Sequence, residues 1–439
     1  MAERSGSRSP ATTPEELRRV VLASFIGTTI EWYDFFLYGT AAALVFNRLF
    51  FPTLDPLAGT LSAYVTYAVG FVARPLGGAV FGHYGDRLGR KRMLVWSLLL
   101  MGVASTLIGL TPTYAQIGIW APVMLTVLRF CQGIAAGGEW GGAVLLAVEH
   151  SDSNRRGFHG GWPQMGTPFG LLLSTLAFAA VSAWLPEPAF LAWGWRIPFL
   201  LSSILVAIGL FIRLRVMESP AFERVKSAQR ESRTPVVDVF REHPREVLVG
   251  MGMRFAQNLV FYMYTVFALG YGERTLGYPR GVMLRAVMVA SFLGLFSTLF
   301  WSYLSDRVGR RPIYLFGGIA SLLVAFPFFW LLGRGPEFVV IAMVLAMNFG
   351  HDVMYGPMAA TLAELFGTHV RYSGASLVYQ LTSVVSGGVA PFIATLLLAR
   401  YGINAVAAYV ALSCVITIVA TLLAPETHRV RLDEPQPVG

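Results

Sequence analysis

The chain has 439 residues, of which 55% are hydrophobic and only 13% are charged, and its formal net charge is +9. Soluble domains carry roughly 25% charged residues, so this composition excludes an ordinary soluble globular protein. The apolar residues form long runs with few charges, which are typical of membrane-spanning helices; Met93–Gly109, for example, contains no charged residue. We therefore expect an all-α membrane protein.

The chain divides into apolar runs that predict twelve transmembrane helices. The polar N-terminal residues precede these runs and do not have the pattern of a cleavable signal peptide. Most runs exceed the roughly 20 residues that cross the hydrocarbon, so we expect tilted helices or cytoplasmic extensions. The predicted ranges are 20–46, 57–82, 92–110, 117–148, 158–184, 194–215, 245–271, 281–304, 312–332, 337–363, 374–399 and 403–423.

A long polar stretch, residues 216–244, separates the predicted helices into two groups of six. We interpret it as a cytoplasmic linker between an N-terminal six-helix bundle at 20–215 and a C-terminal six-helix bundle at 245–423. Residues 1–19 and 424–439 are then cytoplasmic tails.

The distribution of lysine and arginine orients the predicted helices. These residues gather in the loops on the side of the two termini, as in 87–92 and 307–311, and are sparse on the other side. Cytoplasmic loops of membrane proteins carry such an excess, so we place both termini in the cytoplasm. The same bias explains the net positive charge without nucleic-acid binding.

The two halves of the sequence resemble each other. Residues 305–311 (SDRVGRR), after the eighth predicted helix, echo residues 85–91 (GDRLGRK), after the second. Glu149 ends the fourth helix as Glu364 ends the tenth. Internal repeats of this kind are typical of secondary transporters, and they place a binding site near the membrane midplane between the halves.

The loop after the second predicted helix has the pattern Gly82-x-x-x-Asp86-Arg87-x-Gly89-Arg90. Its glycines permit a tight turn, and its aspartate can pair with an arginine or cap the start of a neighbouring helix. Such contacts would form a latch that opens when the halves rock; the alternative is a basic turn that only sets topology. The second loop has Ser302 where the first has Gly82. The predicted gating residues are Gly82, Asp86, Arg87, Gly89, Arg90, Glu149, Asp306 and Arg310.

With this loop, five further segments resemble the major facilitator superfamily. Within it they are similar to the metabolite:proton symporters, which include shikimate, citrate, α-ketoglutarate and proline/betaine carriers. The resemblance covers residues 17–428 and implies two six-helix bundles and proton-coupled transport of a small polar metabolite by alternating access. The segments are Gly27-x-x-x-Glu31-Trp-Tyr-Asp34, Phe71-Val-Ala-Arg74-Pro, Arg129-Phe-x-Gln132-Gly, Gly138-Glu139-Trp-Gly-Gly142 and Trp195-Arg-Ile-Pro-Phe.

Acidic residues inside the first predicted helix are candidates for proton coupling. A charge in the membrane interior is expensive, so each should have a partner or a function. Glu31 lies near the midplane, and Asp34 and Tyr38 share its helix face. Burial favours the neutral form of a carboxyl group, which allows it to take up and release protons. The alternative is a permanent ion pair with an arginine of another helix.

Arg129 lies near the middle of the fourth predicted helix and should have a carboxylate partner, because arginine keeps its proton. That partner is Glu31, Asp34 or a substrate carboxylate, and we favour an arrangement in which substrate and protein compete. Arg74 could hold Asp34 or Glu139, or extend towards the interface. The predicted proton-coupling residues are Glu31, Asp34 and Arg129.

Polar stripes in the second half are further candidates, although such stripes often only hold helices together. Gln257 and Asn258 lie on the seventh predicted helix, and Asn348, His351 and Asp352 lie on the tenth. His351 could titrate near neutral pH or be a neutral histidine with satisfied hydrogen bonds. The predicted substrate-binding residues are Tyr38, Arg74, Arg129, Gln132, Glu139, Gln164, Gln257, Asn258, Asn348, Asp352 and Tyr379.

Motifs for other functions are missing from the sequence. There is no Walker loop for ATP, no Cys/His metal cluster and no nucleophile elbow, so we expect no enzyme activity, metal or cofactor, and an ion gradient as energy source. The leading hypothesis is proton-coupled uptake of a small polar metabolite, an organic acid, across a bacterial inner membrane. Alternatives are proton-coupled efflux and a sensor built on a transporter fold. The expected partners are the substrate, an anion or a zwitterion, protons and lipid, and the expected state is a monomer.

Overall fold

The computed structural model describes residues 14–88, 90–138, 154–215, 243–366 and 371–428, together with residues 140, 144, 147, 148, 151, 152, 239 and 241. All regular secondary structure within these residues is helical. Eight helical stretches among them are long and apolar enough to cross a membrane. Large apolar side chains cover the outer surface; Leu323 is 70% exposed and Phe296 is 62% exposed. Exposed apolar surface on this scale fits a molecule surrounded by lipid.

The first half of the chain contains long helices joined by short helical turns. The first long helix, α1, begins at Pro14. Proline is tolerated there because a backbone N–H in the first turn of a helix has no partner within the helix. The elements are α1 (Pro14–Leu44), α2 (Phe46–Phe50), α3 (Pro56–Leu88), α4 (Arg90–Leu110), α5 (Tyr114–Ile117), α6 (Trp120–Gly137), α8 (Arg156–Trp184), α9 (Glu187–Ala192), η1 (Gly194–Arg196) and α10 (Ile197–Arg215).

The second half differs because three of its long helices contain a π-helical segment, η2, η4 or η5. Such segments widen the helix locally and occur frequently at functional sites. The elements are α13 (Pro244–Tyr262), η2 (Met263–Phe267), α14 (Ala268–Arg274), α15 (Arg280–Val308), α16 (Arg310–Leu332), η3 (Pro336–Phe338), α17 (Val339–Val344), η4 (Leu345–His351), α18 (Asp352–Leu365), α19 (Arg371–Thr382), η5 (Ser383–Gly388), α20 (Ala390–Tyr401) and α21 (Ile403–Leu423).

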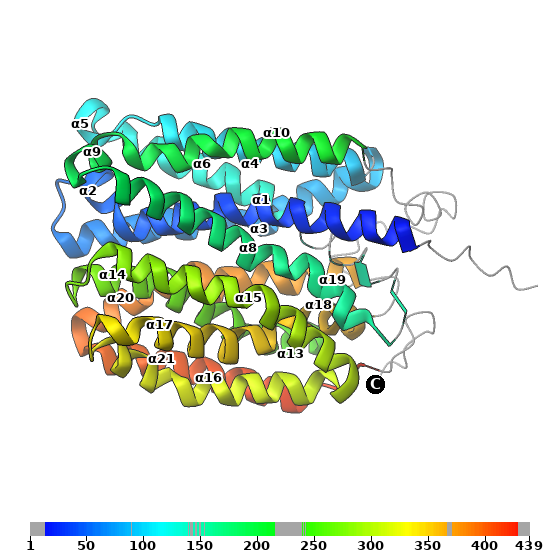
Figure 1. Ribbon diagram of the computed structural model, residues 1–439. Coiled ribbons are helices and arrows are strands. Elements are labelled where there is room, and N and C mark those ends of the chain that lie inside the picture. Colours follow the sequence, from blue (N-terminus) through cyan, green and yellow to red (C-terminus); the bar gives the residue numbers. More distant parts are fainter. Residues whose placement is uncertain are drawn as a thin grey trace, which may run out of the picture.

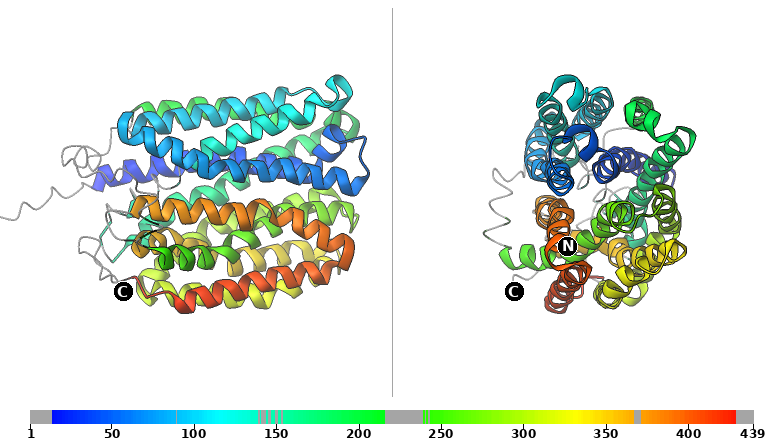
Figure 2. Two further views of the ribbon diagram at one scale, coloured as in Figure 1. Left: turned by 180° about the vertical axis from the view of Figure 1, so that it is seen from behind. Right: turned by 90° about the vertical axis from the view of Figure 1, so that its left-hand side faces the viewer.

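The long helices run side by side, and the two halves of the chain form two groups (Figure 1). The view along the helices separates α1–α10 from α13–α21 (Figure 2). The groups meet where α8 packs against α15 and α18, and where α3 packs against α19 and η5. The start of α1 and the end of α21 lie at the same end of the molecule, whereas α2, α5 and α9 lie at the other end (Figure 1).

Within the described residues, the predicted ranges overlap the helices and differ from them at the ends; the last part of the range 117–148 lies mostly outside the described residues. The helix predicted at 20–46 is α1, which begins earlier, at Pro14, and stops at Leu44 before the short helix α2. The helix predicted at 337–363 is built from η3, α17, η4 and α18 in succession. Most of the predicted linker, residues 216–238, lies outside the described residues.

Candidate functional site

Arg129 of α6 lies in a cage of aromatic rings. Its guanidinium carbon is 4.0 Å from the ring centre of Phe35, 4.4 Å from that of Tyr38 and 4.9 Å from that of Tyr67. Nη1 donates a hydrogen bond of 3.0 Å to Oε1 of Gln132, which lies one helical turn further along. Aromatic faces attract a cation. The predicted residues Arg129, Gln132 and Tyr38 therefore lie together.

A carboxylate partner for Arg129 is missing from the described residues. Neither Glu31 nor Asp34 forms an ion pair with it, and its Nη2 has no hydrogen-bond partner there. Of the two protein partners considered from the sequence, neither Glu31 nor Asp34 is paired with Arg129 in this conformation.

Glu31 pairs instead with Arg74, at 3.8 Å between Oε1 and Nη2. The guanidinium of Arg74 also lies 4.5 Å from the ring centre of Phe35, which it shares with Arg129. Nε and Nη1 of Arg74 have no hydrogen-bond partner among the described residues, and its side chain is buried. Arg74 therefore keeps donors that point into the protein without an acceptor.

Asp34 points away from these arginines towards α10. The hydroxyl of Ser202 donates a hydrogen bond to its Oδ1, and Oδ2 has no hydrogen-bond partner within the described ranges. Asp34 is fully buried. It is thus a carboxyl group held by a neutral hydroxyl, with no arginine paired to it in the part of the chain that the structure describes.

Arg254 of α13 is a third buried arginine at this level, and it is not among the predicted binding residues. Its guanidinium carbon lies 3.6 Å from the ring centre of Tyr379. Nη1 donates to the backbone carbonyl of Tyr379 at 2.7 Å and to the hydroxyl of Ser383 at 3.0 Å, and Nη2 donates to Oδ1 of Asn258 at 3.2 Å. The sequence did contain a signal for Arg254, because it is an arginine within an apolar run and a charge inside a membrane usually has a function.

The three arginines come together around Tyr262 of α13. The guanidinium of Arg74 lies 5.6 Å from the ring centre of Phe71, a neighbour of Tyr262, and Arg254 lies on the same helix as Tyr262. The guanidinium of Arg129 lies 4.9 Å from the ring centre of Tyr67, which is 6.1 Å from that of Tyr262. The ring of Tyr262 packs against Phe71 of α3 at a centroid distance of 5.1 Å, which is a contact between the two halves. Two arginines of the first half and one of the second therefore converge on the boundary between the halves.

Polar residues of the second half form a hydrogen-bonded cluster close to this boundary. The side-chain nitrogen of Gln257 lies 2.7 Å from Nε2 of His351, and Nδ1 of His351 lies 2.8 Å from Oδ1 of Asp352. Oδ2 of Asp352 accepts hydrogen bonds from Asn348, at 2.8 Å, and from the hydroxyl of Ser297. The predicted residues Gln257, Asn348 and Asp352 are therefore linked through His351.

Other predicted residues join the two halves directly. Gln164 of α8 donates to the backbone carbonyl of Tyr355 of α18 at 3.2 Å, and its Oε1 accepts from Nε1 of Trp140 at 3.1 Å. The ring of Trp140 stacks on Tyr379 at a centroid distance of 3.8 Å. Asn258 donates to the hydroxyl of Ser386 and stays within the second half. Glu139 lies outside the described residues.

One predicted latch is visible at the end of the molecule that carries the start of α1. Asp306 accepts hydrogen bonds from the backbone N–H groups of Gly157 and Phe158, at 2.7 and 2.8 Å. Arg310 pairs with Asp306 at 2.7 Å and with Glu364 at 3.0 Å. Asp306 therefore both pairs with an arginine and caps a helix of the other half. Gly89 and Glu149, and the side chains of Asp86, Arg87 and Arg90, lie outside the described residues, whereas Gly82 lies within α3.

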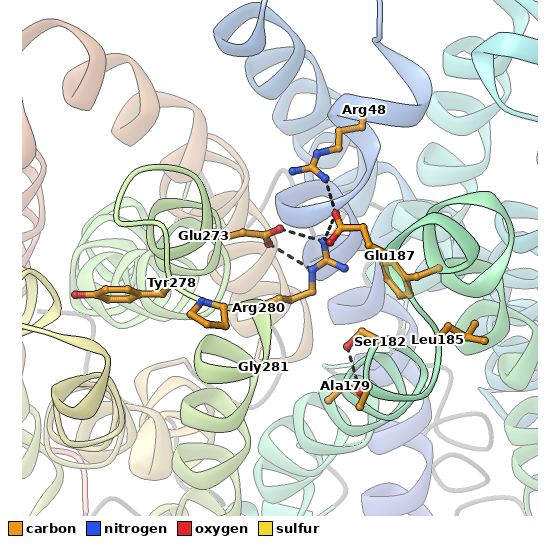
Figure 3. A pocket seen from close by; sticks show the side chains of 12 residues that line it. Arg48, Ala179, Ser182, Leu185, Glu187, Glu273, Tyr278, Arg280 and Gly281 are labelled. Atoms are coloured by element: carbon orange, nitrogen blue, oxygen red, sulfur yellow. Dashed lines mark hydrogen bonds and ion pairs between the residues drawn. The ribbon is translucent and has the colours of Figure 1, made fainter.

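The opposite end has a charged network that the sequence did not predict. Arg48 pairs with Glu187 at 2.7 Å, and Arg280 pairs with Glu273 at 3.0 Å and with Glu187 at 3.7 Å (Figure 3). The contact between Arg280 and Glu187 joins the two halves, and the four residues line a pocket of about 360 Å³. These residues belong to four helices that are separate in the sequence, so no sequence pattern reveals such a pairing.

The described residues contain no group of three or more His, Cys, Asp or Glu side chains arranged to hold a metal ion.

The family model described as Major Facilitator Superfamily matches residues 24–390. The chain is 43% identical over 417 residues to the shikimate transporter of Escherichia coli K12, covering 94% of this chain and 95% of that relative. It is 34% identical over 384 residues to the proline/betaine transporter of the same strain, covering 85% and 76%. The solved structure of the proton:xylose symporter XylE with 6-bromo-6-deoxy-D-glucose is similar in fold, with a TM-score of 0.75 at 17% identity, over 94% of this chain and 97% of that one.

Proposed function

The chain belongs to the major facilitator superfamily, and on that basis we propose that it is a secondary active transporter, not an enzyme, that carries a small organic acid together with protons. We place it in a bacterial inner membrane as a monomer with twelve spanning helices and both termini in the cytoplasm. The loop distribution of lysine and arginine supports this orientation. The proton gradient supplies the energy, and no cofactor is needed.

The observation that carries the proposal is the convergence of Arg74, Arg129 and Arg254 at the boundary between the halves. All three are buried, yet among the described residues only Arg74 forms an ion pair, with Glu31. Buried guanidinium groups are expensive without an opposing charge. A carboxylate fits their paired donors in bidentate geometry, so an anion is the ligand class that this site suits best.

The aromatic side chains around these arginines favour a substrate with a compact carbon skeleton. Phe35, Tyr38 and Tyr67 surround Arg129, and Tyr379 covers Arg254. A small acid would direct its carboxylate to a guanidinium and pack its apolar atoms against these rings. The shikimate transporter is a relative whose named substrate is of this class.

We place the proton-dependent step on the acids of α1. A proton on Glu31 would remove the charge that holds Arg74 and free this guanidinium for the substrate. Asp34, whose carboxyl group accepts a hydrogen bond from Ser202, offers a second site on the same helix. Protons and substrate would then load together, because each makes the other's binding less costly.

Alternating access would follow from the contacts at the two ends. Opening to the outside breaks the contact between Arg280 and Glu187, and opening to the cytoplasm breaks the contacts of Asp306 with the start of α8. In this conformation both sets are formed. The substrate site lies between them, as expected for a binding site that is reached from alternate sides.

A ligand screen and a transport assay test the proposal. Thermal unfolding of the purified protein would be followed with shikimate, benzoate, succinate, glycine betaine and proline as probes. Proteoliposomes would then be tested for accumulation of the stabilising acid driven by acid outside. Arg129→Gln and Arg254→Gln are expected to abolish stabilisation by the acid, because the lost charge is replaced by a neutral amide.

The matched control is Arg334→Gln, which removes an arginine that lies over Trp330, outside the cluster. It should bind and transport like the parent protein. Stabilisation by betaine or proline but by none of the acids would refute the anion assignment. Exchange only against an outward proton flux would support efflux instead of uptake.

A further inference from the structure

His351 and Asp352 form a buried acid–base pair at the junction of η4 and α18. Both side chains are almost fully buried, at 2% and 2% residue exposure. Within the described ranges, His351 is the only group in contact with the Asp352 carboxylate that can carry a positive charge. A buried carboxylate without a cation is costly in a membrane, and a proton on the histidine would supply that cation.

The hydrogen bonds define which atom is available to the proton. Because Asp352 accepts hydrogen bonds from Ser297 and Asn348, we assign it as a carboxylate and assign the ring proton of neutral His351 to Nδ1, which faces Oδ1 of Asp352. Nε2 of the ring then accepts from the side-chain nitrogen of Gln257 at 2.7 Å. Nε2 is therefore the basic atom of the pair.

Gln257 connects this atom to the substrate site. Its Oε1 is buried and has no hydrogen-bond partner among the described residues. When Nε2 of His351 takes up a proton, it becomes a donor, and the Gln257 amide must turn to present Oε1. The amide nitrogen is then released and becomes a free donor on the face of α13 that also carries Arg254 and Phe261.

The ring of His351 also touches residues that bridge the two halves. It stacks on Tyr355 at a centroid distance of 5.0 Å, and the hydroxyl of Tyr355 is hydrogen-bonded to Thr167 of α8 at 2.5 Å. It packs against Phe261 at 4.8 Å, and Phe261 in turn contacts Phe36 of α1 at 5.2 Å. His351 therefore contacts two residues, Tyr355 and Phe261, that in turn contact helices of the first half.

The surrounding elements supply few other charges. Arg254 on α13 is held by Tyr379 of α19 and by Asn258. The remaining titratable neighbours are phenols, which stay neutral at physiological pH: Tyr262 on α13, Tyr314 on α16, Tyr355 on α18 and Tyr379 on α19. The elements α8 and α15 contribute the hydroxyls of Thr167 and Ser297.

We propose that His351 and Asp352 form a second proton-binding site, in the C-terminal half, whose occupancy is passed to the substrate site by rotation of the Gln257 amide. Its role in coupling rests on the proposed transport function, but proton binding itself does not. One proton passes from hydronium to Nε2 of His351 and leaves a water molecule behind; the hydrogen bond from the Gln257 nitrogen to Nε2 is replaced by one from the new N–H to Oε1 of Gln257. The site is separate from Glu31 and Asp34 in the first half.

The experiment is a pH titration of ¹⁵N-histidine-labelled protein in lipid nanodiscs, followed by nuclear magnetic resonance between about pH 5 and about pH 8, the range in which the charge of a histidine ordinarily changes. The chain has seven histidines, and His351→Gln identifies the signal. We expect Nε2 of His351 to change from an acceptor to a protonated nitrogen within this range. Asp352→Asn should change which ring nitrogen of His351 carries the proton in the neutral form, because an amide can donate to Nδ1 as well as accept from it.

His159→Gln, at the start of α8, is the control and should leave the His351 signal unchanged. A His351 ring that keeps one neutral tautomer, or one that stays charged, over the whole range would overturn the proposal. So would a Gln257→Ala variant with an unaltered His351 titration, since the amide would then play no part. No transport is measured, so failure of the proposed transport function would be seen separately, in the proteoliposome assay.

Discussion

The carboxylate of Asp306 accepts a hydrogen bond of 2.7 Å from the backbone N–H of Gly157, so the end of α15 caps the start of α8 across the two halves. The start of a helix carries free N–H groups and a partial positive charge, which attract a carboxylate. Arg310 holds Asp306 in place at 2.7 Å. The latch therefore consists of a carboxylate of one half and backbone N–H groups of the other. Its hydrogen bonds form only when the end of α15 lies at the start of α8.

Asp306→Ala is expected to open the end of the molecule that carries the start of α1 (Figure 1). Hydrogen bonds to a charged group contribute about 1.5–3 kcal/mol each, so the population open at this end should rise at least about tenfold. Spin labels at Asn154→Cys and Arg307→Cys, in a background without Cys131 and Cys414, would report the separation of α8 and α15. Glu337→Gln, at the opposite end, is the control. An unchanged distance distribution in Asp306→Ala would show that the cap does not hold this end closed.

The charged network around Glu187 should respond to charge reversal at Arg280 (Figure 3). Arg280→Glu places a third acid beside Glu187 and Glu273, so repulsion should open this end of the molecule. Exposed pairs contribute only about 0.2–1 kcal/mol, and neutralisation by Glu187→Gln should therefore have a small effect. Labels at Ala183→Cys and Gly281→Cys would measure the opening. Adding Glu187→Arg to Arg280→Glu should reverse most of it; failure of this rescue would argue against a direct pairing across the halves.

Gly70→Ala should weaken substrate binding without unfolding the protein. A Cβ at Gly70 would lie 2.5 Å from Nε of Arg129, so the flexible arginine must move out of its aromatic cage. Loss of one charged hydrogen bond to the ligand corresponds to about tenfold weaker binding or more. Titration calorimetry with the acid identified in the screen would measure it.

Gly77→Ala provides the contrast to this variant. There a Cβ would lie 2.0 Å from the backbone carbonyl oxygen of Ile134, which cannot move without separating α3 from α6. We expect lower thermal stability in Gly77→Ala and near-normal stability in Gly70→Ala. Equal losses of stability in both would mean that Gly70 serves packing alone.

The hydrogen bonds of Glu426, near the C-terminal end of the described chain, predict that the stability of the folded state depends on pH. Burial raises its pKa, but hydrogen bonds from the backbone N–H groups of Arg310, His428 and Arg311 outweigh burial and hold the pKa of Glu426 below its ordinary value. A lowered pKa stabilises the folded state fully above the ordinary value of an unfolded glutamate, and this contribution is lost as the pH falls through the folded pKa.

Glu426→Gln should therefore lower the thermal stability near neutral pH, by about 1 kcal/mol on the scale of helix caps. The difference between parent and variant should shrink on acidification, because the parent loses its carboxylate. Thermal unfolding in detergent at a series of pH values would measure it. A difference that stays constant down to acidic pH would rule out the ionised carboxylate as its cause.

The location of the charged residues within the helices was predictable from local pattern. Glu31, Asp34 and Arg129 interrupt apolar runs, and the cost of charge in lipid makes each of them a candidate on its own. The same reasoning applies to Arg254, which also interrupts an apolar run but is not among the predicted binding residues. The SDRVGRR segment likewise predicted that Asp306 would act in a latch, because the repeat is visible in the sequence.

The apolar runs, the internal repeat and the bias of lysine and arginine together determined a membrane protein of two related halves, because each is a property of neighbouring residues. The partners of the buried charges were decided by the tertiary structure alone. Helix rotation and crossing turn Glu31 towards Arg74, Asp34 towards Ser202 and Arg129 towards aromatic rings. The same is true of Arg280 with Glu187 and of Gln257 with His351, since periodicity along one helix does not define which face of another helix it will meet.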